Sequence, residues 1–179
     1  CLTKRGGHIV YFLHNRRVGQ ESLSVNDAIH KAKTFLKERG YESMHNSYYE
    51  KVDGVATVNF AYKQNEVVCY SDLIKVKVAL DDGQIVGMEA NGYVMNHEVR
   101  DIRTPHLTKQ EARSKVSSRL SIDSVNIALI PKDSKREVLC YEFKGTSGGR
   151  NFLIYINADT GREEDIQILI ESPDGILTI

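Results

Sequence analysis

The sequence is poor in the features that mark several large classes of protein. Its 24 basic and 24 acidic residues give a formal net charge of zero. No basic stretch interleaved with aromatic residues could follow a phosphate backbone, so we expect no nucleic-acid partner. No apolar run approaches the roughly 20 residues of a membrane helix, so we expect no membrane contact by these residues. The N-terminus also lacks the charged start, apolar middle and small-residue cleavage site of a secretory signal.

Cysteine and proline are scarce as well, with three residues of each. The three cysteines cannot all pair with one another, and no Cys-x-x-Cys spacing indicates zinc or redox chemistry. Cys69 and Cys140 stand in apolar stretches, where a cysteine acts as a small buried hydrophobic residue. A chain of 179 residues with 41% hydrophobic residues is long enough for one large domain or two small ones, so we expect a folded protein.

A repeat organises the chain. Aligning Leu23 with Leu107, an offset of 84 (107 − 23), superimposes residues 24–28 on residues 108–112, and both stretches have the pattern of a helix capping box. We expect Gly40 to end the first helix. Each predicted helix carries apolar residues four apart, which form one buried stripe: Ala28, Ala32 and Leu36 in the first, and Ala112, Val116 and Leu120 in the second.

After each helix the sequence predicts β-strands. Apolar residues alternate with polar ones over residues 58–62 and 74–80 in the first repeat and over residues 166–170 in the second. Residues 138–143 and 152–156 are further predicted strands of the second repeat. Each repeat is therefore expected to be a helix packed on an antiparallel sheet, which is an α+β fold.

A Tyr-His-Arg pattern precedes each capped helix: Tyr11, His14 and Arg17 before the first, and Tyr93, His97 and Arg100 before the second. One interpretation is structural, in which these residues pack and hydrogen-bond to carbonyls or carboxylates and so fix the geometry between repeats. The functional alternative is a partner-binding ridge. The pattern also indicates that residues 1–20 end an earlier, truncated repeat, so we expect repeats at 21–103 and 104–179.

Two short motifs resemble catalytic sites but fit turns better. Asp159-Thr160-Gly161 matches the Asp-Thr-Gly of aspartic proteases, yet charged residues follow it and its repeat partner is Asp81-Asp82-Gly83, so we expect a hairpin turn. Residues 145–149 match the nucleophile elbow around Ser147, but a predicted strand follows where the elbow needs a helix. Four residues after His97 stands an aspartate rather than the second histidine of a zinc-protease helix. We expect no catalytic residue, no metal and no cofactor.

The order of capped helix, strands and a last strand pair turned at Asp-x-Gly resembles the PepSY domain, which occurs in propeptides of secreted metallopeptidases and in envelope proteins. A longer combination is similar to the C-terminal region of YpeB-type spore germination proteins. It consists of residues 6–12 leading to Arg16-Arg17-Val18-Gly19, followed by two repeats that end on residues 155–161. The resemblance covers essentially the whole chain.

This resemblance implies a role without catalysis, because the family supplies no catalytic residue that maps onto these positions. YpeB-type proteins are held by an N-terminal membrane segment outside the forespore cytoplasm, which implies an upstream anchor and a place at the spore inner membrane and cortex. The implied partner is the cortex-lytic transglycosylase SleB, which these proteins help to accumulate and restrain until germination. The alternatives are an inhibitory or chaperone-like module for another envelope hydrolase or peptidase, a self-associating structural protein and, less favoured, a small protease.

The last predicted strand is the candidate contact surface. A strand that faces solvent or leaves an edge free can accept a partner by strand addition or hold it against a sheet face. Gln167 and Glu171, expected to be exposed on this strand, are therefore candidate partner-binding residues. Binding of this kind would inhibit or protect a hydrolase by occlusion rather than by chemistry.

Overall fold

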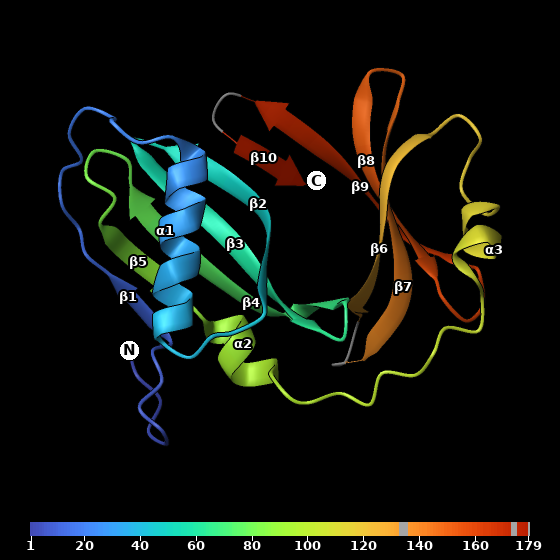
Figure 1. Cartoon of the computed structure of the whole chain (residues 1–179), viewed down its shortest axis with the longest axis horizontal. Helices are drawn as coiled ribbons and strands as arrows, with labels where there is room; N and C mark the ends of the chain where they lie inside the picture. The colour runs from blue at the N-terminus through green and yellow to red at the C-terminus, as the bar shows by residue number, and fades with distance from the viewer. Residues whose placement is uncertain (133–135, 173–174, 179) are drawn as a thin grey trace. The chain divides into compact units, whose positions relative to one another are not determined.

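Two helix-on-sheet units make up the chain in the computed structural model, which describes residues 1–132, 136–172 and 175–178 (Figure 1). The predicted α+β class is confirmed, whereas the repeat boundaries at 20/21 and 103/104 stay a prediction. No helix in the described ranges is long and apolar enough to cross a membrane. The first unit comprises Cys1–Lys63, Ser71–His97 and Ser172–Ile176, and the second comprises Gln64–Tyr70, Glu98–Glu171 and Leu177–Ile179.

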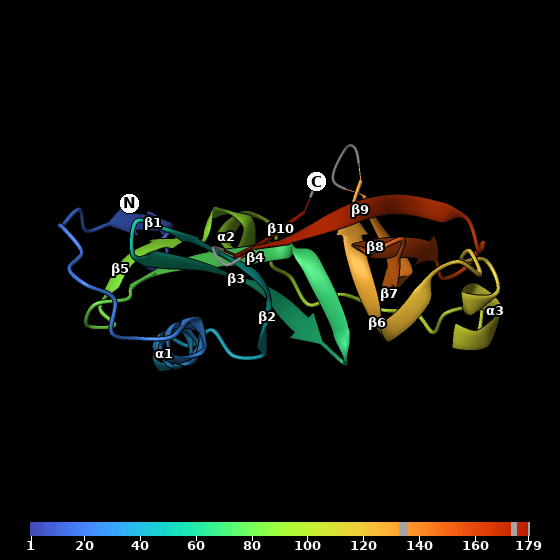
Figure 2. The same cartoon turned by 90° about the horizontal axis from the view of Figure 1, so that it is seen from above.

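The first unit is a sheet with one long helix on one of its faces, which Figure 2 shows nearly edge-on. The strand order is β1-β5-β4-β3-β2, and antiparallel registers join β1 to β5, β5 to β4 and β3 to β2. The predicted strand at 58–62 lies within β3, and the predicted strand at 74–80 matches the end of β4 apart from its last residue. The elements are β1 (Tyr11–Leu13), α1 (Val25–Glu38), β2 (Met44–Val52), β3 (Val55–Gln64), β4 (Val67–Ala79), β5 (Ile85–Glu89) and α2 (Asn91–Asn96).

Helix α1 begins and ends with the signals that the sequence predicts. The hydroxyl of Ser24 accepts from the amide of Asp27 (3.2 Å), and the carboxylate of Asp27 accepts from the amide of Ser24 (3.0 Å). The bond from the Ser24 hydroxyl is the largest cause of a lowered pKa at Asp27. Gly40, with φ of +80°, ends the helix, and its amide and that of Tyr41 return to carbonyls of the last turn. The predicted stripe is fully buried against the sheet: Ala28, Ala32 and Leu36.

The second unit repeats this plan with the strand order β9-β8-β7-β6, in which all neighbours are antiparallel. The first residues of β4, Val67 to Cys69, add a parallel pairing with β6 that the sequence did not predict. The predicted strands at 138–143, 152–156 and 166–170 lie within β7, β8 and β9. The elements are α3 (Lys109–Arg113), β6 (Ser121–Pro131), β7 (Glu137–Ser147), β8 (Arg150–Asn157) and β9 (Glu163–Ser172), whereas β10 (Gly175–Thr178) begins in the first unit, where Gly175 pairs with Glu50 of β2.

The second helix is much shorter than predicted, because α3 ends at Arg113. Val116 and Leu120, which the four-residue spacing placed on this helix, lie beyond it, although both are buried as expected. The Ser114 hydroxyl donates to a carbonyl three residues earlier (2.6 Å), and the amides of Val116 and Leu120 make the same short three-residue bonds. A serine that bonds the backbone locally and tight three-residue turns both compete with a regular α-helix.

The segment before each helix is fastened to the end of the strand that precedes the Asp-x-Gly turn. In the first unit the amide of Leu23 donates to the carbonyl of Leu80, and in the second the amide of Leu107 donates to the carbonyl of Ala158, both at 2.9 Å. These two bonds are repeat equivalents, since each involves the apolar residue just before the helix cap. They fix where each helix starts on its sheet.

An ion pair strengthens this attachment in the first unit. The Arg16 guanidinium donates to both carboxylate oxygens of Asp81 (2.8 and 2.7 Å) and to Asp82 (2.7 Å), and the amide of Gly19 also donates to Asp81 (2.7 Å). The Arg16 side chain is the largest cause of a pKa at Asp81 well below the usual range of a carboxyl group, and the Gly19 amide is the next. The charged form of Asp81 is therefore the form that the fold stabilises.

We predict that Asp81 contributes to the acid sensitivity of the fold. Because its pKa is lowered in the folded state, its contribution is complete above the ordinary aspartate pKa of about 4 and is lost as the pH falls below that value. Asp81→Asn should lower the free energy of unfolding at pH 7, and the two proteins should converge towards pH 2 in urea titrations. Asp53→Asn, in an exposed turn, is the matched control and should not change the pH profile. Parallel wild-type and Asp81→Asn profiles would contradict this role.

Candidate partner-binding site

The first Tyr-His-Arg set lies on the surface of the first unit. Tyr11 is 45% exposed on β1, and His14 donates its backbone amide to a β5 carbonyl (2.7 Å). The Arg17 side chain is exposed, and the ion pair with the Asp-x-Gly turn comes from its neighbour Arg16. The repeat alignment could have identified Arg16, because the offset of 84 that aligns the helices places Arg16 on Arg100 (100 − 16). The Tyr-His-Arg pattern selected Arg17 instead, which needs an offset of 83.

The second set begins with a cluster around a buried carboxylate. Nδ1 of His97 lies 2.7 Å from Oδ2 of Asp72, which is fully buried on β4. The His97 ring stacks on Tyr93 (4.1 Å between centroids) and meets the Tyr62 ring edge-on (4.6 Å). A buried carboxylate needs such a polar partner, which gives His97 a structural task. Asp72 was not among the predicted residues, although its place two residues before Ile74 put a carboxylate in the buried row of the strand.

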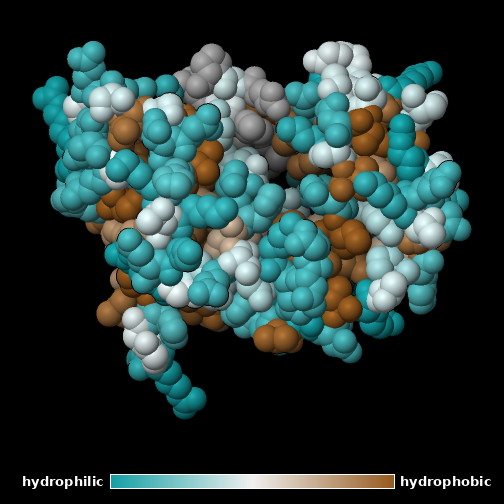
Figure 3. Space-filling view, in the orientation of Figure 1, coloured by the Kyte–Doolittle hydropathy of each residue, from teal (hydrophilic) through white to brown (hydrophobic). Residues whose placement is uncertain are grey.

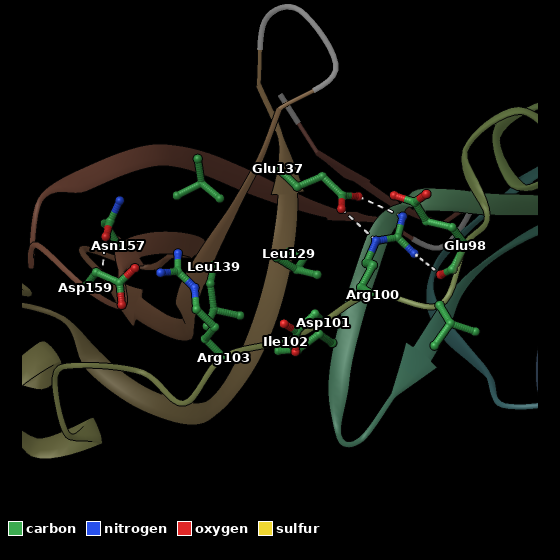
Figure 4. Close-up of a pocket in the computed structure, with 12 residues that line it drawn as sticks. Glu98, Arg100, Asp101, Ile102, Arg103, Leu129, Glu137, Leu139, Asn157 and Asp159 are labelled. Carbon is green, nitrogen blue, oxygen red and sulfur yellow. Dashed lines mark hydrogen bonds and ion pairs between the residues drawn. The ribbon is translucent and has the colours of Figure 1, made fainter.

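Arg100 makes the most enclosed ion pair of the predicted set. Its Nε and Nη2 atoms donate to the two oxygens of Glu137 (2.6 and 2.9 Å), and only 7% of the Arg100 side chain and 20% of the Glu137 side chain are exposed. The backbone of Arg100 exchanges two further hydrogen bonds with the Gln64 side chain (3.1 and 2.7 Å). Arg100 thus holds the segment before α3 against the start of β7, as Figure 4 shows.

A cleft of about 610 Å³ lies between this segment and the sheet of the second unit. Leu129, Val138 and Leu139 supply apolar surface, and Arg103 extends its guanidinium toward the turn that carries Asp159 (Figure 4). The described lining therefore combines apolar surface with charged side chains of both signs.

Both motifs that resemble catalytic sites form hairpin turns, as predicted. The amides of Asp159 and Thr160 donate to the side-chain oxygen of Asn157 (3.0 and 2.9 Å), and the following glycine has φ of +71°. This turn joins β8 to β9. Ser147 faces Arg150 across the β7–β8 hairpin, whose two central glycines have φ of +56° and +75°, the positive values that a type I′ turn requires.

Metal and thiol chemistry find no support in the described ranges. No three His, Cys, Asp or Glu side chains gather there in a way that could hold a metal ion. Cys69 and Cys140 are fully buried, as predicted for small hydrophobic residues. Burial raises the pKa of Cys140 to about 12, so this side chain remains a protonated thiol at neutral pH.

The predicted contact strand is β9, which exposes apolar side chains next to the predicted polar ones. Gln167 is half-buried and donates to Asp165 (3.0 Å), while the side chain of Glu171 lies outside the described part of the structure. Ile166 and Ile170 are 46% and 44% exposed. Ile166 pairs with Ile154 of β8, which lies on the face of the sheet that α3 covers. Ile166 and Ile170 therefore lie on that same face.

The short α3 helix leaves this face incompletely covered. Apolar atoms reach the surface over the second unit (Figure 3). A depression of about 390 Å³ lies beside the helix and is lined by Lys109, Gln110, Arg113, Ile122, Val125 and Phe143. The alternation of isoleucines predicted the strand correctly, and the expected exposure near Ile166 and Ile170 agrees with their half-exposed side chains.

We predict that the arginines of the two Tyr-His-Arg sets differ in their effect on stability. Arg100→Ala should lower the free energy of unfolding by about 3 kcal/mol, because it leaves Glu137 largely buried without its bidentate partner. Arg17→Ala, at an exposed position, is the matched control and should change it by less than about 0.5 kcal/mol. Chemical denaturation of the three proteins measures both values. Equal effects of the two substitutions would show that the Arg100–Glu137 pair does not hold the segment.

Known protein families match most of the chain. The family described as "YpeB sporulation, PepSY1 and PepSY2 domains" matches residues 1–103, and the one described as "Peptidase propeptide and YPEB domain" matches residues 107–167. Two relatives are named "Sporulation protein YpeB". The one from Halalkalibacterium halodurans is 41% identical over 96% of this chain, and the one from Bacillus subtilis is 38% identical over 94%. The chain spans 38% of the length of each.

A solved structure has the same fold. The Bacillus megaterium YpeB C-terminal domain is 34% identical, with a TM-score of 0.87 over 95% of this chain and 76% of that one. The two family matches lie in different halves of the sequence, and the structural match covers nearly all of it. The chain therefore belongs to the YpeB family of sporulation proteins and has the fold of that family's PepSY-containing C-terminal region.

Proposed function

We propose that this chain is a non-catalytic part of a spore germination protein that binds, stabilises and restrains a cortex-lytic enzyme of the SleB type until germination. Its place would be outside the forespore cytoplasm, at the spore inner membrane and cortex, with a membrane anchor upstream. Membership of a sporulation family supports this proposal. The chain spans 38% of its curated relatives, so the activity of the whole protein is part of the same proposal.

The exposed apolar side chains of β9 are the observation that carries the binding role. Ile166 and Ile170 remain about half-exposed on a strand whose neighbours, including Ile154, are buried. Large apolar side chains that stay in water at one edge of a sheet are a feature of interaction surfaces. Gln167 follows Ile166 on the strand and therefore projects from the opposite face, where its side chain donates to Asp165.

The two Tyr-His-Arg sets take different parts in the proposal. Tyr93, His97 and Arg100 form contacts inside their own units, and we assign them to holding the segment that leads to α3. Tyr11, His14 and Arg17 have exposed side chains and are available to a partner or to a second copy of the chain. Glu171 stays a candidate through its place on β9.

Restraint by such a surface needs no chemistry. A hydrolase held against the β9 side of the second unit would have part of its own surface covered and would lose freedom to reach an insoluble substrate. The enzyme would also be stabilised, because any partner that binds the folded state alone shifts the folding equilibrium toward it. Binding, protection and restraint then have one physical origin.

A direct test measures capture and lytic activity together. The 179-residue chain, immobilised and mixed with a purified SleB-type enzyme, should retain the enzyme and lower its rate of release of cortex fragments at equimolar ratio. Ile166→Arg with Ile170→Arg should abolish both effects, because two charges would replace the apolar contact. Val52→Arg, at a side chain 54% exposed in the first unit, is the matched control and should leave both unchanged.

Two results would overturn the proposal. The first is no capture of the enzyme, and the second is hydrolysis of cortex fragments by the chain itself. Capture of a different envelope hydrolase or peptidase in place of the SleB-type enzyme would keep the binding role and replace its partner. Sedimentation that depends on chain concentration, with no hydrolase bound, would instead favour a self-associating structural protein.

A further inference from the structure

Strands β5 and β9 are equivalent elements, and their outer edges differ. Each is the last strand of its meander and follows the Asp-x-Gly turn, where the two glycines are 78 residues apart (161 − 83). The same offset relates the paired residues on either side of the turn. Val76 faces Met88 in the first unit, and Ile154 faces Ile166 in the second. Ile166 is therefore the counterpart of Met88 (166 − 88 = 78).

In the first unit this edge is covered. Phe12 of β1 pairs with Met88 and packs against Phe35 of α1. Hydrogen bonds flank the pair on both sides, from the amide of Ala90 to the carbonyl of Val10 (2.8 Å) and from His14 to β5 (2.7 Å). Under this cover Met88 is only 1% exposed.

In the second unit the same edge holds a different arrangement. The amide of Ile166 donates to the carboxylate of its neighbour Asp165 (3.0 Å), at an exposed position. An amide bonded there points away from β8, because backbone groups in antiparallel strands alternate between the two edges. Ile166 is 46% exposed where Met88 is buried. The residues that match β1 in the sequence pattern, Tyr93 to His97, form α2 and its cap instead of a strand.

Strand β10 does not account for this part of the edge. It is a four-residue strand beside β9 in the sheet, and four residues counted back from the end of β9 at Ser172 reach Leu169. Ile166 lies three residues further toward the start of β9. The carboxylate of Asp165 acts as a local cap for an amide that an added strand would otherwise use, a common way to protect a sheet edge.

We propose that the outer edge of β9 around Ile166 is a strand-addition site for an extended segment of the partner hydrolase, a proposal that rests on the binding role above. The segment has the β1 pattern, with a large apolar residue opposite Ile166. In the β1 register the three positions after it lie opposite Asp165, Glu164 and Glu163, which favour basic residues there. The chain's own sequence from His8 to Arg17 has the large apolar residue, with His14 at the middle one of these positions, and supplies a probe. Asp165 is the group that the incoming strand displaces from the Ile166 amide.

The test uses the full 179-residue chain and a labelled peptide of residues 8–17. Fluorescence anisotropy gives the affinity, and amide chemical shifts in the ¹⁵N-labelled chain give the location, which should be Ile166 and its neighbours on β9. A peptide that carries Phe12→Asp is the control ligand and should bind at least tenfold more weakly.

Two substitutions at one position separate backbone pairing from side-chain contact. Ile166→Ala keeps the amide and should weaken binding about threefold, while Ile166→Pro removes the amide and should weaken it at least tenfold. Proline is tolerated best at an outer edge such as this one, where the Ile166 amide donates to the neighbouring carboxylate. Asp165→Ala should tighten binding about threefold, since it frees the amide. Melting temperatures measured by circular dichroism show whether each variant is folded.

The proposal fails if the peptide does not bind at millimolar concentration, if the shifts map to β1 or another edge, or if Ile166→Pro and Ile166→Ala bind equally. Repeating the enzyme capture with Ile166→Pro separates it from the proposed function. Capture that persists with this variant keeps the proposed function and overturns strand addition. Peptide binding at Ile166 without any capture of the enzyme keeps the edge as a binding site and overturns the hydrolase as its occupant.

Discussion

Each unit depends on the backbone hydrogen bond that ties the residue before its helix cap to the end of its third strand. The bond from Leu23 to Leu80 and the bond from Leu107 to Ala158 have the same length, 2.9 Å, and both lie beside an Asp-x-Gly turn. With the entry to the helix fixed there, the capping box sets its first turn and the apolar stripe can only face the sheet. The packing of a helix on a sheet, which each unit has within its own core, therefore depends on this one attachment.

The differences between the units begin after that attachment and decide what each one exposes. Helix α1 is 14 residues long and ends at a left-handed glycine, whereas α3 has five residues and is followed by Ser114, whose hydroxyl donates to the carbonyl of Glu111. The first sheet also has β1 along its outer edge. Met88 is buried under this cover, and its counterpart Ile166 is not. A repeat with one architecture thus presents a closed sheet in one unit and an open one in the other.

Local signals in the sequence were enough to predict much of the fold. The capping boxes at Ser24 and Thr108 and the strand periods involve residues close together in the chain, and all of them are confirmed. The length of α3 was predicted wrongly, because apolar spacing identifies buried positions without showing that the backbone between them is helical. The turn at Asp159 was predicted by comparing the repeats, and the turn at Ser147 was predicted from the strand that follows it.

The site was harder to predict because it depends on contacts between distant residues. Arg16 and Glu137 form ion pairs with residues far away in the sequence, and neither has a local pattern that names its partner. Met88 is buried because β1 lies along the outer edge of the first sheet. Its counterpart Ile166 is half-exposed, and the residues that match β1 in the second repeat form α2 instead of a strand. Such effects arise only once the strands are assembled.

In the proposed role the chain binds its partner through the β9 side of its second unit. Amide hydrogen exchange of the chain, alone and with a SleB-type enzyme, reports on this surface because it follows each backbone amide. We expect exchange to slow at Ile166 and its neighbours on β9 in the complex, while β5, already covered by β1, does not change. Slowed exchange elsewhere with β9 unchanged, or no change anywhere, would show that the partner does not bind at β9.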